Sequence, residues 1–511
     1  MNIGKETSNT HQAFWVIIGS LSSFSLAIVS SAILSRYFPK EEYGTYKQII
    51  YIYSTLLIIF TAGLPEVFAY FLPRYGIEEG RAIVWKITKT LFLSGALFSL
   101  FLFLSSGVIA EFLNNPELEL GIKVFSPIPF LLLPTLGIEG IFSTYKKTIF
   151  IGIYNTLTRF ITLLFIVLPV IIFKGSYLTA IYGWIVVSFI SLLIAFYFKG
   201  IPFGGVKPMK ASLTYKSIFQ YSLPLVTASL WGIGLRSADQ FYISRYFGSK
   251  VFAEFSNGFM QLPLVSMVTS ATSLVLMPVF SKMVHDKTAL NDLLSLWKNA
   301  LFKSALIIYP IVIFAIFFAN DIIVIIFSKA YEHSTIYFQI NMVLNFFNII
   351  VFAPLILSLG KTRLYSRIHM FFALAVWALE YLAILIFHSP IAVAFVSVFM
   401  GILIGIVFMF YISISLKVNI AQLFPFKLIM KIVLHNIFII LLLKYSFDSL
   451  KIQSTILELS LASIVYAVLI LGTSKPIRLN YFEPIKPILL KNELFVSLNK
   501  KIRNTIIGKI Y

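Results

Sequence analysis

The sequence predicts an all-α integral membrane protein with about 14 transmembrane helices, arranged as two parallel-repeat six-helix lobes plus two C-terminal helices. Of its 511 residues, 59% are hydrophobic and 12% are charged, whereas soluble domains carry roughly 25% charged residues. Apolar runs of about 20 residues, long enough to cross a bilayer as a helix, recur along the whole chain. Short sequence matches also relate the first half of the chain to the second.

Charge-poor runs and their polar flanks place the helices. The first run, from Ala13 to Ser35, is too long and too rich in serine for a cleaved signal peptide, so we expect it to be retained as a helix. The stretch 381–416 contains no Asp, Glu, Lys or Arg. As one helix it would be about 54 Å long, so "HSP" at 388–390 is expected to divide it. The predicted helices are 13–37, 44–72, 83–110, 120–143, 148–172, 177–198, 217–246, 251–281, 295–318, 334–359, 365–387, 391–416, 428–446 and 456–474.

Lysine and arginine are concentrated in alternate loops, and this asymmetry marks the cytoplasmic side of a membrane protein. The linker 199–216 holds four lysines, for example, whereas the intervening loops "PKEEYG" and "EFLNNPELE" are short and partly acidic. With an even number of crossings, both termini are expected in the cytoplasm. The net charge of +20 then reflects loop asymmetry and contact with anionic lipid rather than binding to nucleic acid.

A repeat divides the chain. Ser-Arg-Tyr-Phe occurs at 35–38 and again at 244–247, each time where an apolar run ends, and Trp85-Lys86 matches Trp297-Lys298 in the same order. Because six helices are an even number, both lobes enter the membrane in the same orientation, and a substrate site is expected at their interface. The predicted parts are an N-terminal lobe at 1–198, a cytoplasmic linker at 199–216, a C-terminal lobe at 217–416, two additional helices at 417–474 and a basic cytoplasmic tail at 475–511.

Polar residues inside predicted helices are candidates for the wall of a substrate cavity, because ionisable groups in a membrane usually face a cavity or a partner. Arg159 and Asn155 belong to a polar stripe on helix 148–172, whose alternative role is hydrogen bonding between helices. Arg236 and Asp239 lie three positions apart and could instead neutralise each other. The full set is Arg159, Arg236, Asn155, Asp239, Arg36 and Arg245.

The two arginines of the repeated segment, Arg36 and Arg245, lie at helix ends, where a side chain that reaches the membrane surface is the alternative to a binding role. Two carboxyl groups inside predicted helices, Glu66 and Glu380, are candidates for ion coupling, since burial favours the uncharged form of a carboxyl. No metal site is expected, because the chain has no cysteine and only six scattered histidines. "LGKTRLY" at 359–365 contains Gly-Lys-Thr, but the position of the earlier glycine of a phosphate-binding loop holds Leu355, so no nucleotide site is expected. We expect no cofactor, and the driving force is an H+ or Na+ gradient, the membrane potential or the substrate gradient.

Four segments together resemble bacterial polysaccharide flippases of the multidrug/oligosaccharidyl-lipid/polysaccharide exporter superfamily. They are "ILSRYFPKEEYGTY", "TAGLPEVFAYFLPRY", "QYSLPLVTASLWGIGLRSADQFYISRYFG" and "IIFSKAYEHS". The resemblance implies a transporter, not an enzyme, in the bacterial inner membrane. It implies alternating access that moves undecaprenyl-pyrophosphate-linked oligosaccharides to the outer leaflet for O-antigen, capsule or exopolysaccharide assembly. It further implies that cavity arginines bind the pyrophosphate or acidic sugars, and that membrane lipids and a polysaccharide polymerase machinery are partners.

Three other functions are weighed against this one. A lipid II flippase would share the helix plan and cavity arginines, but the arginines clustered early in such proteins are missing here. A multidrug or cation antiporter would be expected to place an acidic residue in the first helix, and 13–35 contains none. A polymerase or glycosyltransferase would be expected to have a long extracytoplasmic loop, and no such loop is predicted.

Overall fold

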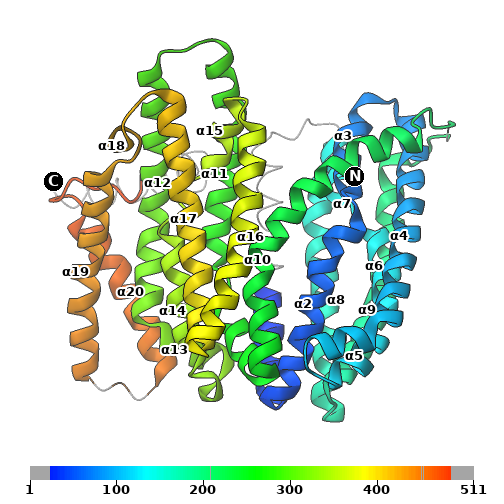
Figure 1. Ribbon diagram of the computed structural model, residues 1–511, viewed down its shortest axis with the longest axis horizontal. Helices are drawn as coiled ribbons and strands as arrows, with labels where there is room; N and C mark the ends of the chain where they lie inside the picture. The colour runs from blue at the N-terminus through cyan, green and yellow to red at the C-terminus, as the bar shows by residue number, and fades with distance from the viewer. Residues whose placement is uncertain (1–23, 208, 451, 453, 485–511) are drawn as a thin grey trace, which may run out of the picture. The chain divides into compact units, whose positions relative to one another are not determined.

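The computed structural model describes residues 24–207, 209–450, 452 and 454–484, and these residues form helices without a strand (Figure 1). The start of the predicted helix 13–37 and most of the predicted tail lie outside them. After the helix Phe24–Tyr37, the α-helices in chain order are α2 Lys40–Thr61, α3 Leu64–Phe71, α4 Ile77–Phe112, α5 Glu117–Phe125, α6 Pro127–Leu132, α7 Ile138–Thr144, α8 Ile149–Phe173, α9 Tyr177–Gly200, α10 Tyr215–Gly258, α11 Pro263–His285, α12 Leu290–Phe317, α13 Ala319–Phe327, α14 Ser334–Asn345, α15 Phe352–Ser358, α16 Thr362–Phe387, α17 Pro390–Leu416, α18 Ile420–Leu423, α19 Phe426–Leu450 and α20 Thr455–Thr473.

The predicted all-helical membrane fold is confirmed, but the number of 14 spans is not. In the described part of the chain, 10 helices are long and apolar enough to cross a membrane, and two bent pairs raise the number to 12. The predicted helix 44–72 is one of these pairs, with a bend of 45° between α2 and α3. Ala62 and Gly63 both have left-handed backbone conformations, and Pro65 offers no N–H to continue the hydrogen-bond series.

The break predicted between helices 217–246 and 251–281 is present at Gly248, where φ is 80° and ψ is 175°. A second break departs from the prediction, because α10 ends at Gly258 and α11 begins only at Pro263. Leu262 is extended, with ψ of 118°, as expected for a residue that precedes proline. The predicted helix 251–281 is therefore wrong as one continuous helix.

The described residues form two compact units. The first contains residues up to Phe259 together with Ile326–Tyr337 and Ser366–Ser397, and the second contains Met260–Ile325, Phe338–Tyr365 and the chain from Val398 onward. The first unit therefore includes α2 to α10 and most of α16. The predicted boundaries of the lobes, the linker and the two additional helices stay predictions.

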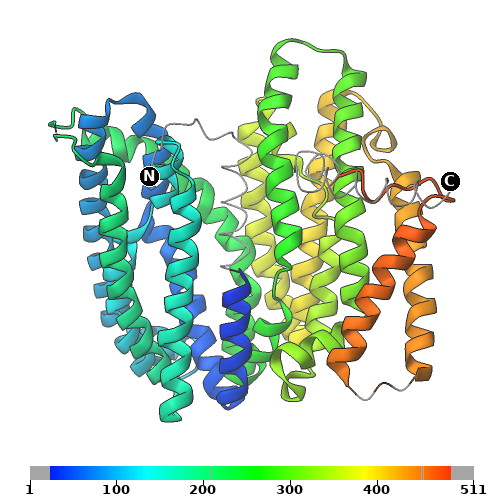
Figure 2. The same ribbon diagram turned by 180° about the vertical axis from the view of Figure 1, so that it is seen from behind.

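In the first unit, an apolar cluster joins α3, α4 and α7 and includes Val67, Phe68, Ile83, Ile87 and Ile141. In the second unit, α19 and α20 run side by side in opposite directions (Figures 1 and 2). The ring of Phe314 on α12 lies 5.4 Å from the ring of Tyr466 on α20. Apolar side chains thus hold each unit together, as in other helix bundles.

One lysine of the first unit is fully buried among these helices. Lys199, near the end of α9, is 1% exposed, and its Nζ donates to the Pro134 carbonyl at 2.7 Å and to Thr88 Oγ1 at 3.2 Å. Pro134 lies in a short 3-10 turn just before Gly137, whose φ is 86°. The lysine therefore supplies hydrogen bonds at the break between α6 and α7, where the helical hydrogen bonds of the backbone are interrupted.

Replacing Lys199 with alanine should lower the free energy of unfolding by about 2 kcal/mol, because a buried carbonyl and a buried hydroxyl lose their hydrogen-bond donor. Thermal unfolding of the detergent-purified protein measures the effect. Lys210→Ala, at an exposed position, is the control and should change stability by no more than about 0.5 kcal/mol. Equal effects of the two substitutions would contradict the role given to Lys199.

Candidate functional site

The two arginines of the repeated Ser-Arg-Tyr-Phe segment make matching contacts in the first unit. Arg36 donates a hydrogen bond from a terminal guanidinium nitrogen to the Ile326 carbonyl, near the end of α13, at 2.5 Å. Arg245 on α10 donates to the carbonyl of Phe112, the last residue of α4. Carbonyls at helix ends lack intrahelical donors and attract cations. Each arginine thus binds a helix end that belongs to the other half of the repeat.

Two ion pairs beside these arginines also join residues of the first half of the sequence to residues of the second half. Lys40 of the first half pairs with Glu254 of the second at 2.5 Å, and Lys250 of the second half pairs with Glu41 of the first at 3.7 Å. The Lys40 and Glu254 side chains are 19% and 11% exposed, whereas those of Lys250 and Glu41 are 59% and 62% exposed. The Lys40–Glu254 pair is therefore the less screened of the two. We call the six residues the clasp: Arg36, Lys40, Glu41, Arg245, Lys250 and Glu254.

Next to the clasp, α2 and α10 pack closely through a buried polar network. Gln48 on α2 is fully buried, donates to Ser244 Oγ on α10 at 2.6 Å and accepts from Asn115 Nδ2 at 2.6 Å. Asn115 Nδ2 also lies 3.0 Å from Thr45 Oγ1. A side chain at Gly44 would place its Cβ 1.9 Å from the Ser249 carbonyl oxygen. Glycine at this position therefore permits the close approach of the two helices.

A buried tyrosine pair extends the contact on the other side of Lys40. The hydroxyl of Tyr43 donates to Asn257 Oδ1 at 3.1 Å, and its ring meets the ring of Tyr331 at 5.8 Å with an edge-to-face geometry. The ammonium of Lys40 lies 5.5 Å from the Tyr331 ring centre. Burial, followed by the charges of Glu254 and Glu41, raises the pKa of Tyr331. This side chain therefore stays a neutral phenol beside the ion pair.

Further along α10, the structure brings two buried carboxyl groups together. Asp239 is 6% exposed, and its carboxylate accepts hydrogen bonds from the Ser397 hydroxyl at 2.8 Å and from the Gln240 amide at 2.7 Å. Glu380 on α16 is 0% exposed, and in the described part of the chain neither of its carboxyl oxygens has a hydrogen-bond partner. The two groups interact electrostatically. A proton or a cation bound at Glu380 would satisfy oxygens that are otherwise costly to bury.

Packing fixes the helices that carry these carboxyls. Trp377 Nε1 on α16 donates to the Gly234 carbonyl at 2.9 Å, and the Tyr242 hydroxyl on α10 donates to the Trp377 carbonyl at 3.0 Å. The Tyr51 hydroxyl on α2 donates to the Ser237 carbonyl at 3.1 Å. The clasp, the polar network and the carboxyl pair therefore each include at least one residue of α10.

Of the residues predicted from sequence, the structure brings only Asp239 and Glu380 together. Arg236 is exposed, and among the described residues Asp239 bonds Ser397 and Gln240 rather than Arg236, so the suggested pairing between the two is not seen. Glu66 is exposed on α3, unlike Glu380. Arg36 is exposed and Arg245 is half-buried, and both bind carbonyls, a third role beside the two predicted ones.

On α8, Arg159 is exposed and Asn155 donates to Glu139 Oε1 at 3.1 Å. The neighbouring hydroxyls of Thr158 and Thr162 donate to carbonyls of their own helix. Arg159 and Arg236 therefore stay candidates for substrate contact.

Sequence reasoning missed Gln48, Lys40, Glu41, Lys250 and Ser397 as members of the site. The repeated segment could have indicated three of them, because Lys40, Glu41 and Lys250 follow Ser-Arg-Tyr-Phe within ten residues. Gln48 and Ser397 give no such signal. Among the described residues, no group of three or more His, Cys, Asp or Glu side chains could hold a metal ion.

Comparisons with known proteins bear on the family and the fold of the chain. The family model of polysaccharide biosynthesis proteins matches residues 33–336, more than half of the chain, whereas no curated protein sequence matches. The lipid II flippase MurJ, in an inward closed conformation, superimposes with a TM-score of 0.68 at 14% identity over 91% of this chain and 99% of that one. An inward-facing multidrug resistance MATE family transporter of the MOP superfamily gives 0.60 at 12% identity over 82% and 96%. The MATE transporter VcmN of Vibrio cholerae, in its bent form, gives 0.55 at 13% identity over 81% and 97%.

At these identities the solved structures show the fold alone. The family model and the shared fold together confirm the resemblance found in the sequence. The chain belongs to the polysaccharide biosynthesis protein family and has the fold of the MurJ and MATE transporters.

Proposed function

We propose that the protein moves undecaprenyl-pyrophosphate-linked oligosaccharides from the inner to the outer leaflet of the bacterial cytoplasmic membrane, for O-antigen, capsule or exopolysaccharide assembly. Membership of a polysaccharide biosynthesis family with a transporter fold supports this function over an enzymatic one. The observation that carries the mechanism is the clasp, because it joins the two halves of the repeat through side-chain contacts. Contacts of this kind can break and re-form during alternating access.

The substrate would present a pyrophosphate and sugars to a polar surface between apolar helices. Arg159 and Arg236 are exposed on α8 and α10, and a guanidinium binds phosphate oxygens through paired hydrogen bonds. Lipid II flipping is the second candidate, favoured by the fold similarity to MurJ over 91% of the chain. Both substrates share the pyrophosphate, so the arginines alone do not separate them. A cation antiporter is disfavoured, because 13–35 lacks a carboxylate.

Coupling to an H+ or Na+ gradient would use Glu380 and Asp239, with the Ser397 hydroxyl beside them. Both carboxyls are buried, and both oxygens of Glu380 are unsatisfied among the described residues. Two interacting carboxylates of like charge disfavour each other, so binding one proton or one Na+ at Glu380 would relieve the repulsion. Oxygen ligands suit a hard cation of this type. Because α10 also carries Arg245, Lys250 and Glu254, ion binding there would act on the helix that forms half of the clasp.

Alanine at both Arg159 and Arg236 should reduce surface polysaccharide at least about tenfold at normal protein levels, because the pyrophosphate loses charged hydrogen bonds of roughly 1.5–3 kcal/mol each. Immunoblotting of polysaccharide in a deletion strain that carries the variant measures the effect. Arg363→Ala, exposed near the start of α16, is the matched control. Unchanged polysaccharide in the double variant would contradict the arginine assignment. Rescue of a strain depleted of its lipid II flippase would instead favour the second candidate.

A crosslink between α2 and α10 should stop flipping if these two helices must separate during transport. The chain has no cysteine, so Gln48→Cys with Ser244→Cys supplies the only thiols, at side chains that now lie 2.6 Å apart. A short bis-thiosulfonate crosslinker should abolish transport in proteoliposomes, and reduction should restore it.

The control pair is Thr45→Cys with Asn115→Cys, which joins side chains 3.0 Å apart within the first half of the repeat. Its crosslink should leave transport intact. Full transport activity of the protein crosslinked between positions 48 and 244 would show that α2 and α10 do not separate in the transport cycle.

Glu380→Gln should uncouple transport, because the amide keeps the shape of the side chain but holds neither a proton nor a cation by charge. Flipping in proteoliposomes should lose its response to an imposed H+ or Na+ gradient, with at least about a tenfold lower driven rate. Asp239→Asn should act in the same direction. Glu66→Gln, at an exposed position, is the control, and the coupling assignment fails if this variant is uncoupled while Glu380→Gln responds normally.

A further inference from the structure

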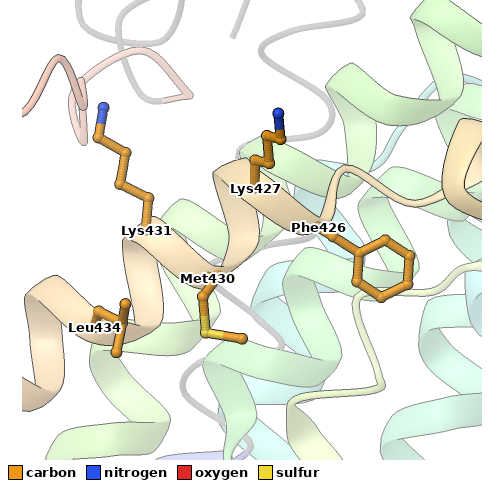
Figure 3. Close-up of a pocket in the computed structure, with 5 residues that line it drawn as sticks. All are labelled: Phe426, Lys427, Met430, Lys431 and Leu434. Atoms are coloured by element: carbon orange, nitrogen blue, oxygen red, sulfur yellow. The ribbon is translucent and has the colours of Figure 1, made fainter.

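The start of α19, in the second unit, presents two kinds of side chain on separate sides (Figure 3). Lys427 and Lys431, one turn apart, reach to the same side, while Phe426, Met430 and Leu434 point away from them. The three apolar side chains are 53%, 55% and 59% exposed, respectively. In a helix apolar enough to cross a membrane, such exposed side chains face acyl chains, and lysines at the helix end lie at the level of the headgroups.

A hydrogen-bond network, buried at Asn436 and Tyr481, holds the segment after α20 against α19. His435 Nδ1 lies 2.9 Å from the Tyr481 hydroxyl, and its Nε2 lies 2.8 Å from Thr473 Oγ1. Asn436 Nδ2 donates to the Tyr481 hydroxyl at 2.9 Å, and the Tyr466 hydroxyl donates to Asn436 Oδ1 at 3.0 Å. Burial raises the pKa of Tyr481 to about 12, so the phenol stays neutral. The segment with Tyr481 is therefore held against α19 at His435 and Asn436, one turn beyond Lys431.

The segment held against α19 adds two cations to the two lysines of that helix. Lys475 and Arg478 are exposed on the fixed segment, whereas Ser474, Leu479 and Tyr481 are buried. The carboxylate of the segment, Glu483, pairs with Lys303 on α12 at 3.5 Å and does not offset the four cations. We call the surface of Lys427, Lys431, Lys475 and Arg478, with the exposed apolar side chains of α19, the basic shelf.

We propose that the basic shelf binds the phosphate headgroup of an anionic phospholipid of the inner leaflet, such as phosphatidylglycerol, whose acyl chains lie along Phe426, Met430 and Leu434. Charge complementarity supports this partner, because a phosphodiester bridges two ammonium groups one helical turn apart. The apolar row directly beside the lysines favours a lipid over a soluble anion. The interaction does not depend on the transported substrate. A failure of this proposal would therefore leave the proposed flipping function untouched, and the reverse also holds.

Lipid retention by the purified full-length protein tests the proposal. The protein is placed in nanodiscs that contain phosphatidylglycerol and phosphatidylcholine in equal amounts, and the lipids that remain bound after detergent extraction are counted by native mass spectrometry. Each lysine near an anionic surface contributes about fivefold in affinity, so Lys427→Gln with Lys431→Gln should lower phosphatidylglycerol retention roughly 25-fold. Lys427→Arg with Lys431→Arg should retain it, which also shows that the position tolerates substitution.

The matched control is Lys282→Gln with Lys287→Gln, which removes two exposed lysines at the end of α11, beside Asp286. It should retain phosphatidylglycerol like the unmodified protein. An equal loss in both glutamine variants would show a general effect of net charge and overturn the site. Displacement of the lipid by millimolar inorganic phosphate would reveal a simple anion site. Displacement by equimolar undecaprenyl phosphate would reveal a binding site for the transported lipid. Either result would overturn the proposal.

Discussion

Unsatisfied polar groups are expensive in apolar surroundings, and the contacts that satisfy them across the repeat join the two halves of the sequence in the first unit. Arg36 and Arg245 each donate to a carbonyl near the end of a helix in the opposite half, and the ion pairs of Lys40 and Lys250 follow the same exchange. The two Ser-Arg-Tyr-Phe segments therefore have the same physical role, because the arginine of each one binds a helix end in the other half of the sequence.

Buried ionisable groups in the first unit fall into two kinds. Lys199 has hydrogen-bond partners for its ammonium and lies at an interruption of the helix series, so its role is structural. Glu380 has no partner among the described residues and lies near a second carboxyl. A group of the second kind stays in an apolar interior only if it binds a proton or an ion in some state of the protein. This contrast separates an ion-coupling candidate from a packing residue without reference to any relative.

Sequence patterns predicted the helices well where composition alone decides them, and less well where the backbone bends. The charge-free stretch 381–416 divides near Pro390, as expected, because no single helix of that length fits a membrane. The bend at Ala62 and Gly63 and the break before Pro263 depend on a few backbone angles, which hydrophobicity does not encode. The polar stripe of Arg159 and Asn155 likewise did not indicate that Asn155 donates to Glu139.

By itself, the sequence determined that the chain is a multi-pass helical membrane protein, because hydrophobic length acts locally along the chain. It also narrowed the polar candidates to a few residues, including Asp239 and Glu380. Only the tertiary structure decided that both carboxyls are buried, that Asp239 bonds Ser397 rather than Arg236, and that Gln48 bridges Ser244 and Asn115. Those pairings join helices far apart in sequence, and their geometry depends on helix packing, which no local pattern records.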